Sequence, residues 1–224
     1  MPADYKFVPP TRGEWIASIA AQIIGFVIIS SLVLLSVKVS AWLWLPTIFL
    51  IFPVLRVFGG LYAKLTRTYD YRSEFAFTHP VREGELELHL GGGYDYPRLW
   101  RMARGNRATM RRLLLGSAIE ALAHVAREIE SGGRPPETRV SAVSYFFSDA
   151  TALRFGFKPE KVSDFEKLFF LLSVGDIVPL YWLMMGSFKL PPLLTLKRYT
   201  AVGSDLVLRR AELESMADRL QRLP

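Results

Sequence analysis

Side chains that can bind metals or transfer protons gather in one short stretch of the sequence. Glu85, Glu87 and His89 alternate with leucines, so a β-strand here presents all three on one face. His79 and Glu83 lie just before them. Carboxylate and imidazole groups at such spacing can hold a metal ion or act as acid and base. Because no metal-ligand spacing such as His-Glu-x-x-His accompanies them, we interpret this face as solvated and predict no metal site.

A run of arginines, which precedes a predicted helix, is the second candidate site. Backbone donors at the start of that helix can hold phosphate groups, and the neighbouring arginines can neutralise them. The residues assigned to such a cofactor site are Arg104, Gly105, Arg107 and Thr109. The competing interpretation is contact with anionic lipid headgroups. The arginines assigned to headgroup contact are Arg98, Arg101, Arg111 and Arg112.

One acidic residue interrupts the apolar stretch from Leu168 to Phe188. Asp176 is the only charge in that stretch. An acid in an apolar segment is a functional candidate, here for a proton or a cation, although a helix cap after Gly175 also explains it.

Several classes of chemistry have no support in the sequence. The chain lacks cysteine, which excludes disulfides, thiolate metal sites and cysteine nucleophiles. It has no Gly-x-Ser-x-Gly elbow, Walker loop or dinucleotide fingerprint. The formal charge is +7, but no motif that reads DNA or RNA accompanies it, so we predict no nucleic-acid partner.

The second half of the chain predicts an α/β fold, with α+β as the alternative. Residues Glu85–Leu90 alternate as a half-buried strand, and Thr109–Glu130 carry a helical apolar stripe. A central strand over Arg139–Phe147 and a short helix ending at Gly156 follow. The end of the chain predicts a strand or strand pair around Gly203 within 197–208, then an amphipathic helix over 211–223.

The order of elements from Arg107 to Pro159 resembles the second half of GNAT-type acetyltransferases. Val140 to Phe147 looks like that family's strand beside the acyl carrier, and the run from Ala152 to Phe157 is similar to its Gly-Phe ending. The resemblance implies acyl-CoA as a cofactor. The family's pyrophosphate pattern is reduced here to one glycine, Gly105, and the tyrosine that often acts as acid is replaced by Ala152.

The N-terminal part is apolar enough to predict a transmembrane helical hairpin over residues 1–66. No charge occurs from Trp15 to Val37, and a second apolar run follows Lys38. Lysines and arginines gather at the two ends of the hairpin, while its loop has only Lys38. This asymmetry predicts an inner membrane of bacterial type with both termini in the cytoplasm. Residues 67–224 then form a cytoplasmic domain against the membrane, with 168–188 interfacial or re-entrant.

Two functions follow from these features. The leading hypothesis is a non-catalytic accessory or assembly subunit of a membrane complex, with lipids and a membrane protein as partners and no cofactor. The alternative is a membrane-associated, GNAT-like acyltransferase that uses acyl-CoA and a lipid-like or membrane-proximal acceptor.

Overall fold

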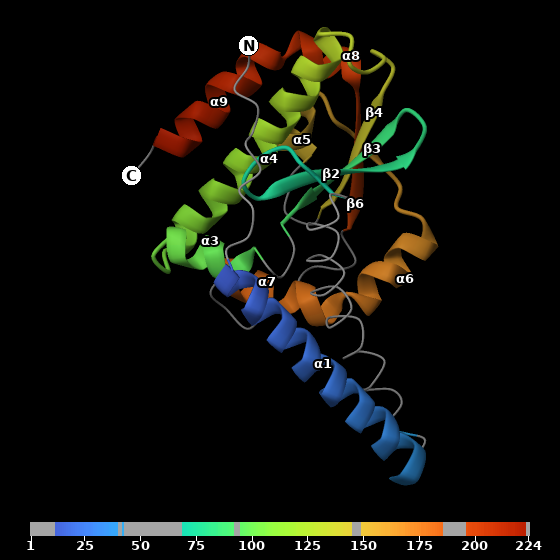
Figure 1. The fold of residues 1–224 in the computed structure, drawn as a ribbon. Helices are drawn as coiled ribbons and strands as arrows, with labels where there is room; N and C mark the ends of the chain where they lie inside the picture. Colours follow the sequence, from blue (N-terminus) through green and yellow to red (C-terminus); the bar gives the residue numbers. More distant parts are fainter. Residues whose placement is uncertain are drawn as a thin grey trace.

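The computed structural model describes residues 12–39, 42, 69–91, 95–144, 149–185 and 196–222. They form an α/β fold around a mixed six-stranded sheet of order β1-β2-β3-β4-β6-β5 (Figure 1). Strands β3 and β4 run parallel, and each other neighbouring pair in this sheet is antiparallel. The strands are β1 (Asp70–Tyr71), β2 (Ala76–Arg82), β3 (Glu85–Leu90), β4 (Arg139–Ser144), β5 (Lys158–Glu160) and β6 (Lys197–Val202).

Helices surround the sheet, and α4 is the central one. In Figure 1, α4 and α9 lie along one side of the sheet, and α6 and α7 follow one another across one end. The helices are α1 (Arg12–Val39), α3 (Tyr96–Met102), α4 (Arg107–Glu130), α5 (Asp149–Arg154), α6 (Asp164–Leu172), α7 (Val174–Met185), α8 (Gly203–Leu208) and α9 (Arg210–Arg222).

The main core lies between α4 and one face of the sheet. Alternation along β3 directs Leu86 and Leu88 into this core, where they meet Ile119 and Val125 of α4. Burial of these side chains supplies the principal stabilisation of the fold. A second, smaller cluster joins α3, α4 and α7 through Phe75, Leu99, Ala103, Met110, Leu114 and Met184.

Most of the predicted elements after residue 84 are confirmed. The predicted strand Glu85–Leu90 is β3, and the helix predicted over 109–130 is α4, which begins two residues earlier at Arg107. Asn106 caps α4 by accepting a hydrogen bond from the Thr109 backbone N–H at 3.1 Å. The central strand is β4, whose described part ends at Ser144.

Of the strand or strand pair predicted within 197–208, one strand is confirmed and the second is not, because the second half is helical. The strand β6 ends at Val202, and Gly203 begins helix α8. A Cβ atom at Gly203 would lie 2.5 Å from Cδ1 of Ile129 and 3.0 Å from the carbonyl oxygen of Pro136. The chain needs glycine for this close approach, so this glycine marks a packing point and not a hairpin turn.

The predicted transmembrane hairpin is corrected by the structure. Within the described residues, no helix combines the length and the apolarity that a membrane crossing requires. The first half of the hairpin corresponds to the single helix α1, and the second half lies, apart from Trp42, outside the described residues. The inner-membrane location, with both termini cytoplasmic, stays a prediction.

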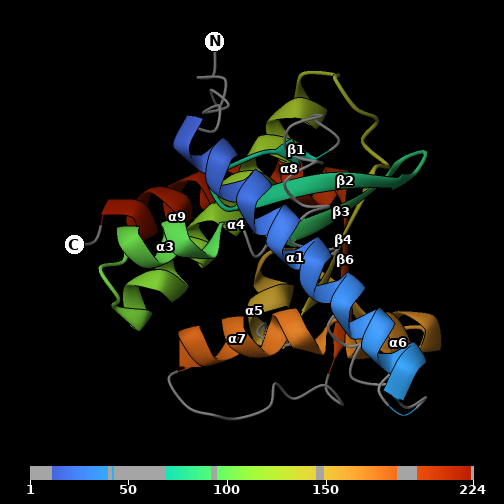
Figure 2. The same ribbon diagram turned by 60° about the horizontal axis from the view of Figure 1, so that its bottom comes forward.

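The described part of the apolar segment, residues 168–185, lies in two helices with a break between them. Helix α6 ends at Leu172 and α7 begins at Val174, so the break falls at Ser173. Ser173 is buried, and its hydroxyl donates to the Phe169 carbonyl at 2.8 Å. Figure 2 shows α6 and α7 in succession at one end of the molecule. The backbone of Asp176 lies in α7, and its side chain is outside the described part.

Candidate functional site

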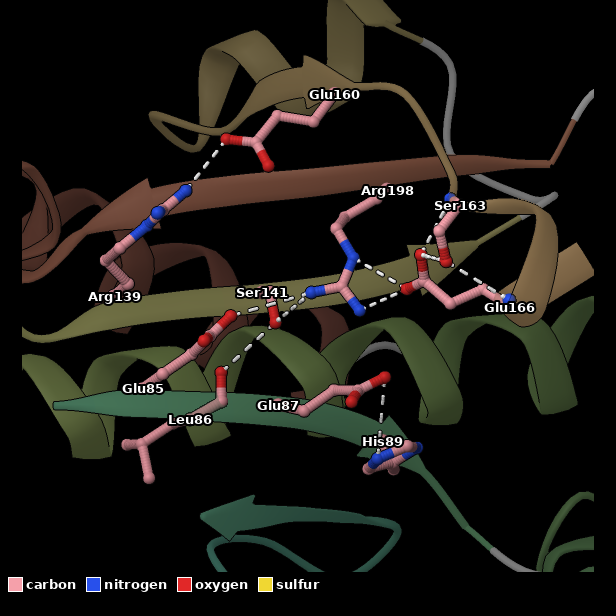
Figure 3. Close-up of polar contacts among 10 residues, drawn as sticks. All are labelled: Glu85, Leu86, Glu87, His89, Arg139, Ser141, Glu160, Ser163, Glu166 and Arg198. Carbon is pink, nitrogen blue, oxygen red and sulfur yellow. Dashed lines mark hydrogen bonds and ion pairs between the residues drawn. The ribbon is translucent and has the colours of Figure 1, made fainter. Parts of the chain in front are cut away.

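A polar cluster occupies the face of the sheet opposite α4. We call it the Arg198 cluster, and Figure 3 shows its members approaching one another from two parallel strands, a third strand and a helix. Because Leu86, Val140 and Tyr199 point into the core, their neighbours along each strand point to the other face. The cluster consists of Glu85 and Glu87 of β3, Ser141 of β4, Glu166 of α6 and Arg198 of β6.

Arg198 joins the members of the cluster. Its Nε lies 2.9 Å from Oε1 of Glu166, and Nη2 contacts the same oxygen. Its Nη1 donates to the Ser141 hydroxyl at 3.3 Å and lies 3.6 Å from Oε1 of Glu85. Only 19% of the Arg198 side chain is exposed, so these contacts are stronger than those of a surface ion pair. The guanidinium therefore fixes α6 against both parallel strands.

Glu166 is held in place by its own helix as well. Ser163 caps α6 and forms a capping box with Glu166, whose Oε2 accepts from the Ser163 backbone N–H at 2.8 Å. Partial burial raises the pKa of Glu166, but hydrogen bonds from Ser163 and Arg198 outweigh that effect and bring the pKa below its ordinary value. Glu166 is thus an ionised structural partner of Arg198.

The pKa of Glu87 is shifted in the opposite direction from that of Glu166. Burial raises the pKa of its carboxyl above the ordinary value, and the positive charge of Arg198 offsets part of that rise. Its Oε1 lies 3.8 Å from Nε2 of His89, and 19% of its side chain is exposed. The strand face predicted to be solvated is thus partly buried, and Glu87 is the most enclosed of its three polar residues. A carboxyl with a raised pKa beside an imidazole is typical of groups that exchange protons.

Aromatic and imidazole rings of β2 lie opposite this part of β3. His79 lies directly opposite Glu87 in the β2–β3 register, and its buried Nδ1 has no hydrogen-bond partner in the described part of the chain. The Phe77 ring stacks on His89 with centroids 5.2 Å apart. No group of three or more carboxylate or imidazole residues in the described ranges could hold a metal ion.

The two parallel strands pair over only three residues each. The pairs run from Glu85 with Arg139 to Glu87 with Ser141, yet β3 continues to Leu90 and β4 to Ser144. Directly past the last pair, on the α4 face, lies a cavity of about 20 Å³. Its lining is entirely apolar and consists of Leu88, Ala118, Ile119, Leu122, Ala142, Ala152, Phe155, Phe157 and Tyr199.

The predicted phosphate site lies elsewhere, at the turn between α3 and α4. Arg104 and Gly105 both have left-handed backbone conformations, with φ of 49° and 72°. Arg104 and Arg107 are exposed, without an ion pair to any described residue. The Asn106 side chain already accepts the Thr109 backbone N–H, so that donor is occupied. The turn is therefore an exposed, positively charged surface.

The arginines predicted to touch lipid headgroups fall into two groups. Arg98 is paired with Glu74, with Nη2 and Oε1 2.6 Å apart, and Arg112 donates to the Thr109 hydroxyl at 3.4 Å. Arg101 and Arg111 are exposed. Their assignment to headgroup contact stays a prediction.

Comparison with known proteins adds no relative. No family description, curated protein or solved structure matches this chain. The resemblance to GNAT-type acetyltransferases therefore enters only as a proposal.

Proposed function

We propose that this chain is an acyltransferase-like enzyme that takes an acyl group from a thioester carrier such as acyl-CoA. The observation that carries the proposal is the position of Glu87. Its carboxyl stands at the last paired residue of β3, beside the point where β3 and β4 stop pairing. A raised pKa at this point suits a group that accepts a proton from an acceptor molecule near neutral pH.

The reaction follows from these groups and from the thioester. An amine or hydroxyl of the acceptor attacks the thioester carbonyl carbon, a new C–N or C–O bond forms, and the C–S bond breaks. The Glu87 carboxylate accepts the proton that the acceptor loses, and the leaving thiolate takes a proton from water. His89, 3.8 Å from Glu87, orients the carboxylate. Arg104 and Arg107 are proposed to neutralise the carrier's phosphates.

Binding of the carrier is the first test. We expect CoA and acetyl-CoA to raise the thermal unfolding temperature of the full chain saturably. The double substitution Arg104→Ala and Arg107→Ala should weaken this shift, because it removes two exposed cations beside the start of α4. Arg82→Ala, an exposed arginine at the end of β2, is the matched control and should bind as the wild type does. Absence of any saturable shift with either compound would sink the proposal.

Turnover is the second test. Release of free thiol from acetyl-CoA, measured with a panel of primary amines, should fall by about 10²- to 10⁴-fold in Glu87→Gln while binding of acetyl-CoA is kept. Glu83→Gln, in the exposed turn before β3, is the matched control. A Glu87→Gln protein with wild-type turnover would remove Glu87 from the mechanism.

An accessory or assembly subunit is the second candidate. Large apolar side chains are exposed along α1 and on α6, among them Phe26, Val37 and Phe165, exposed by 72%, 68% and 76%. Patches of this kind mark surfaces that other proteins cover. Purification in mild detergent tests this candidate: a chain that runs alone, without a co-purifying subunit, counts against it.

A further inference from the structure

We propose that the apolar cavity behind β3 and β4 receives the end of an acyl chain that is about one carbon longer than acetyl. This inference rests on the proposed function and names its substrate class: the site selects propionyl over acetyl thioesters. Three observations support it, namely the position, the chemistry and the size of the cavity.

The cavity begins where the two strands stop pairing. Leu88 and Ala142, which line it, directly follow the last paired residues Glu87 and Ser141. Side chains alternate between faces, so Glu87 and Ser141 belong to the polar side and Leu88 and Ala142 to the core side. An acyl group at this point has its carbonyl near the carboxylate of Glu87 and its alkyl end directed into the cavity.

The lining of the cavity suits an alkyl end and does not suit water. It contains no polar atom, and Tyr199 contributes only its ring, because its hydroxyl donates to Oδ1 of Asp149 at 3.0 Å. A buried water needs two or more polar partners, so an apolar cavity of this kind stays dry. A methyl or methylene group meets no such requirement and gains from burial.

The size of the cavity limits how much of a chain it accepts. A volume of about 20 Å³ holds roughly one water-sized group, which corresponds to about one methyl or methylene. The space exists because three of the lining residues have small side chains, namely Ala118, Ala142 and Ala152. Burial of one methylene group favours binding by about fourfold. Propionyl should therefore bind better than acetyl, and butyryl should gain nothing further.

The test compares dissociation constants of acetyl-CoA, propionyl-CoA and butyryl-CoA for the full chain by calorimetry. We expect propionyl-CoA to bind about fourfold tighter than acetyl-CoA, and butyryl-CoA to bind no tighter than propionyl-CoA. Ala142→Val fills the cavity from β4, and it should abolish this preference while acetyl-CoA still binds. Ala118→Val, which fills it from α4, serves where Ala142→Val does not fold.

Val143→Ile is the matched control, because it enlarges the neighbouring residue of β4 on the opposite face and leaves the cavity open. It should keep the preference for propionyl-CoA. Two results would overturn the cavity assignment and leave the proposed function standing. One is equal binding of acetyl-CoA and propionyl-CoA, and the other is a preference for propionyl-CoA that persists in both Ala142→Val and Ala118→Val. If no CoA thioester binds, the proposed function and this inference fail together.

Discussion

The two faces of strand β3 differ in polarity and in burial. One face, with Leu86 and Leu88, is closed by α4 and belongs to the apolar core. The other, with Glu85, Glu87 and His89, is partly buried among charged groups from β6 and α6. One face of this six-residue strand therefore contributes to the stability of the fold, and the other carries the residues of the proposed chemistry. Substitutions on the core face should change stability, and those on the polar face should mainly change function.

The largest effect is expected on the core face. Leu86→Ala, at a side chain that is 2% exposed, should lower the free energy of unfolding by about 2–5 kcal/mol, because it removes buried methyl groups and leaves a cavity. Chemical denaturation measures this loss. Val81→Ala, at an exposed position of β2, is the control and should stay within about 0.5 kcal/mol of the wild type. Equal losses at both positions would contradict the assignment of the core.

A smaller loss is expected where the polar face is tied to α6. Arg198→Ala removes charged hydrogen bonds to Glu166 and Ser141, and should cost about 1.5–3 kcal/mol of stability. A double-mutant cycle with Glu166→Gln separates the pair from other effects of truncation. A coupling free energy near zero would show that the pair does not hold α6 on the sheet.

A still smaller loss of stability is expected when the N-terminal cap of α6 is removed. Ser163→Ala removes the hydroxyl that accepts the Glu166 backbone N–H at 3.2 Å, and should cost about 1 kcal/mol. Ser163→Thr keeps a hydroxyl that can accept the Glu166 backbone N–H and donate to Glu166 Oε2, and should recover most of this loss. Thermal unfolding of both proteins measures the difference, and an unchanged Ser163→Ala protein would refute the role of the cap.

The smallest effect concerns Glu87 and depends on pH. Because burial raises the pKa of Glu87 in the folded state, the folded protein holds this proton more tightly than the unfolded chain, and stability falls as pH rises through that raised pKa. Glu87→Gln removes this cost, so its unfolding temperature should exceed the wild type's at pH 7 and match it at low pH. A variant that is less stable at pH 7 would show that ionised Glu87 stabilises the fold.

The fold was predictable where local patterns decide the structure. The alternation over Glu85–Leu90 and the apolar stripe after Arg107 predicted β3 and α4, because burial on one face imposes a period on the sequence. The predicted hairpin is wrong because apolarity along the sequence alone does not determine whether two helices pair and cross a membrane. Gly203 was misread because its close approach to Ile129 is a tertiary contact.

The candidate site was only half predictable. Glu85, Glu87 and His89 were found from their spacing, but Arg198 and Glu166 lie far along the chain from them and carry no local motif. Only the sheet order, which inserts β6 between β4 and β5, brings Arg198 beside Ser141. The predicted phosphate site at Arg104 and Arg107 remains a proposal, because exposed arginines in a turn suit many anionic partners equally well.

Hydrogen exchange of backbone amides in the presence of acetyl-CoA tests the central claim most directly. If ligand enters where β3 and β4 stop pairing, then Leu88–Leu90 and Ala142–Ser144 should gain protection, while Ala76–Thr78 of β2 should not change. Acetyl-CoA that binds without protecting either strand end, or that protects only residues remote from them, would contradict the account.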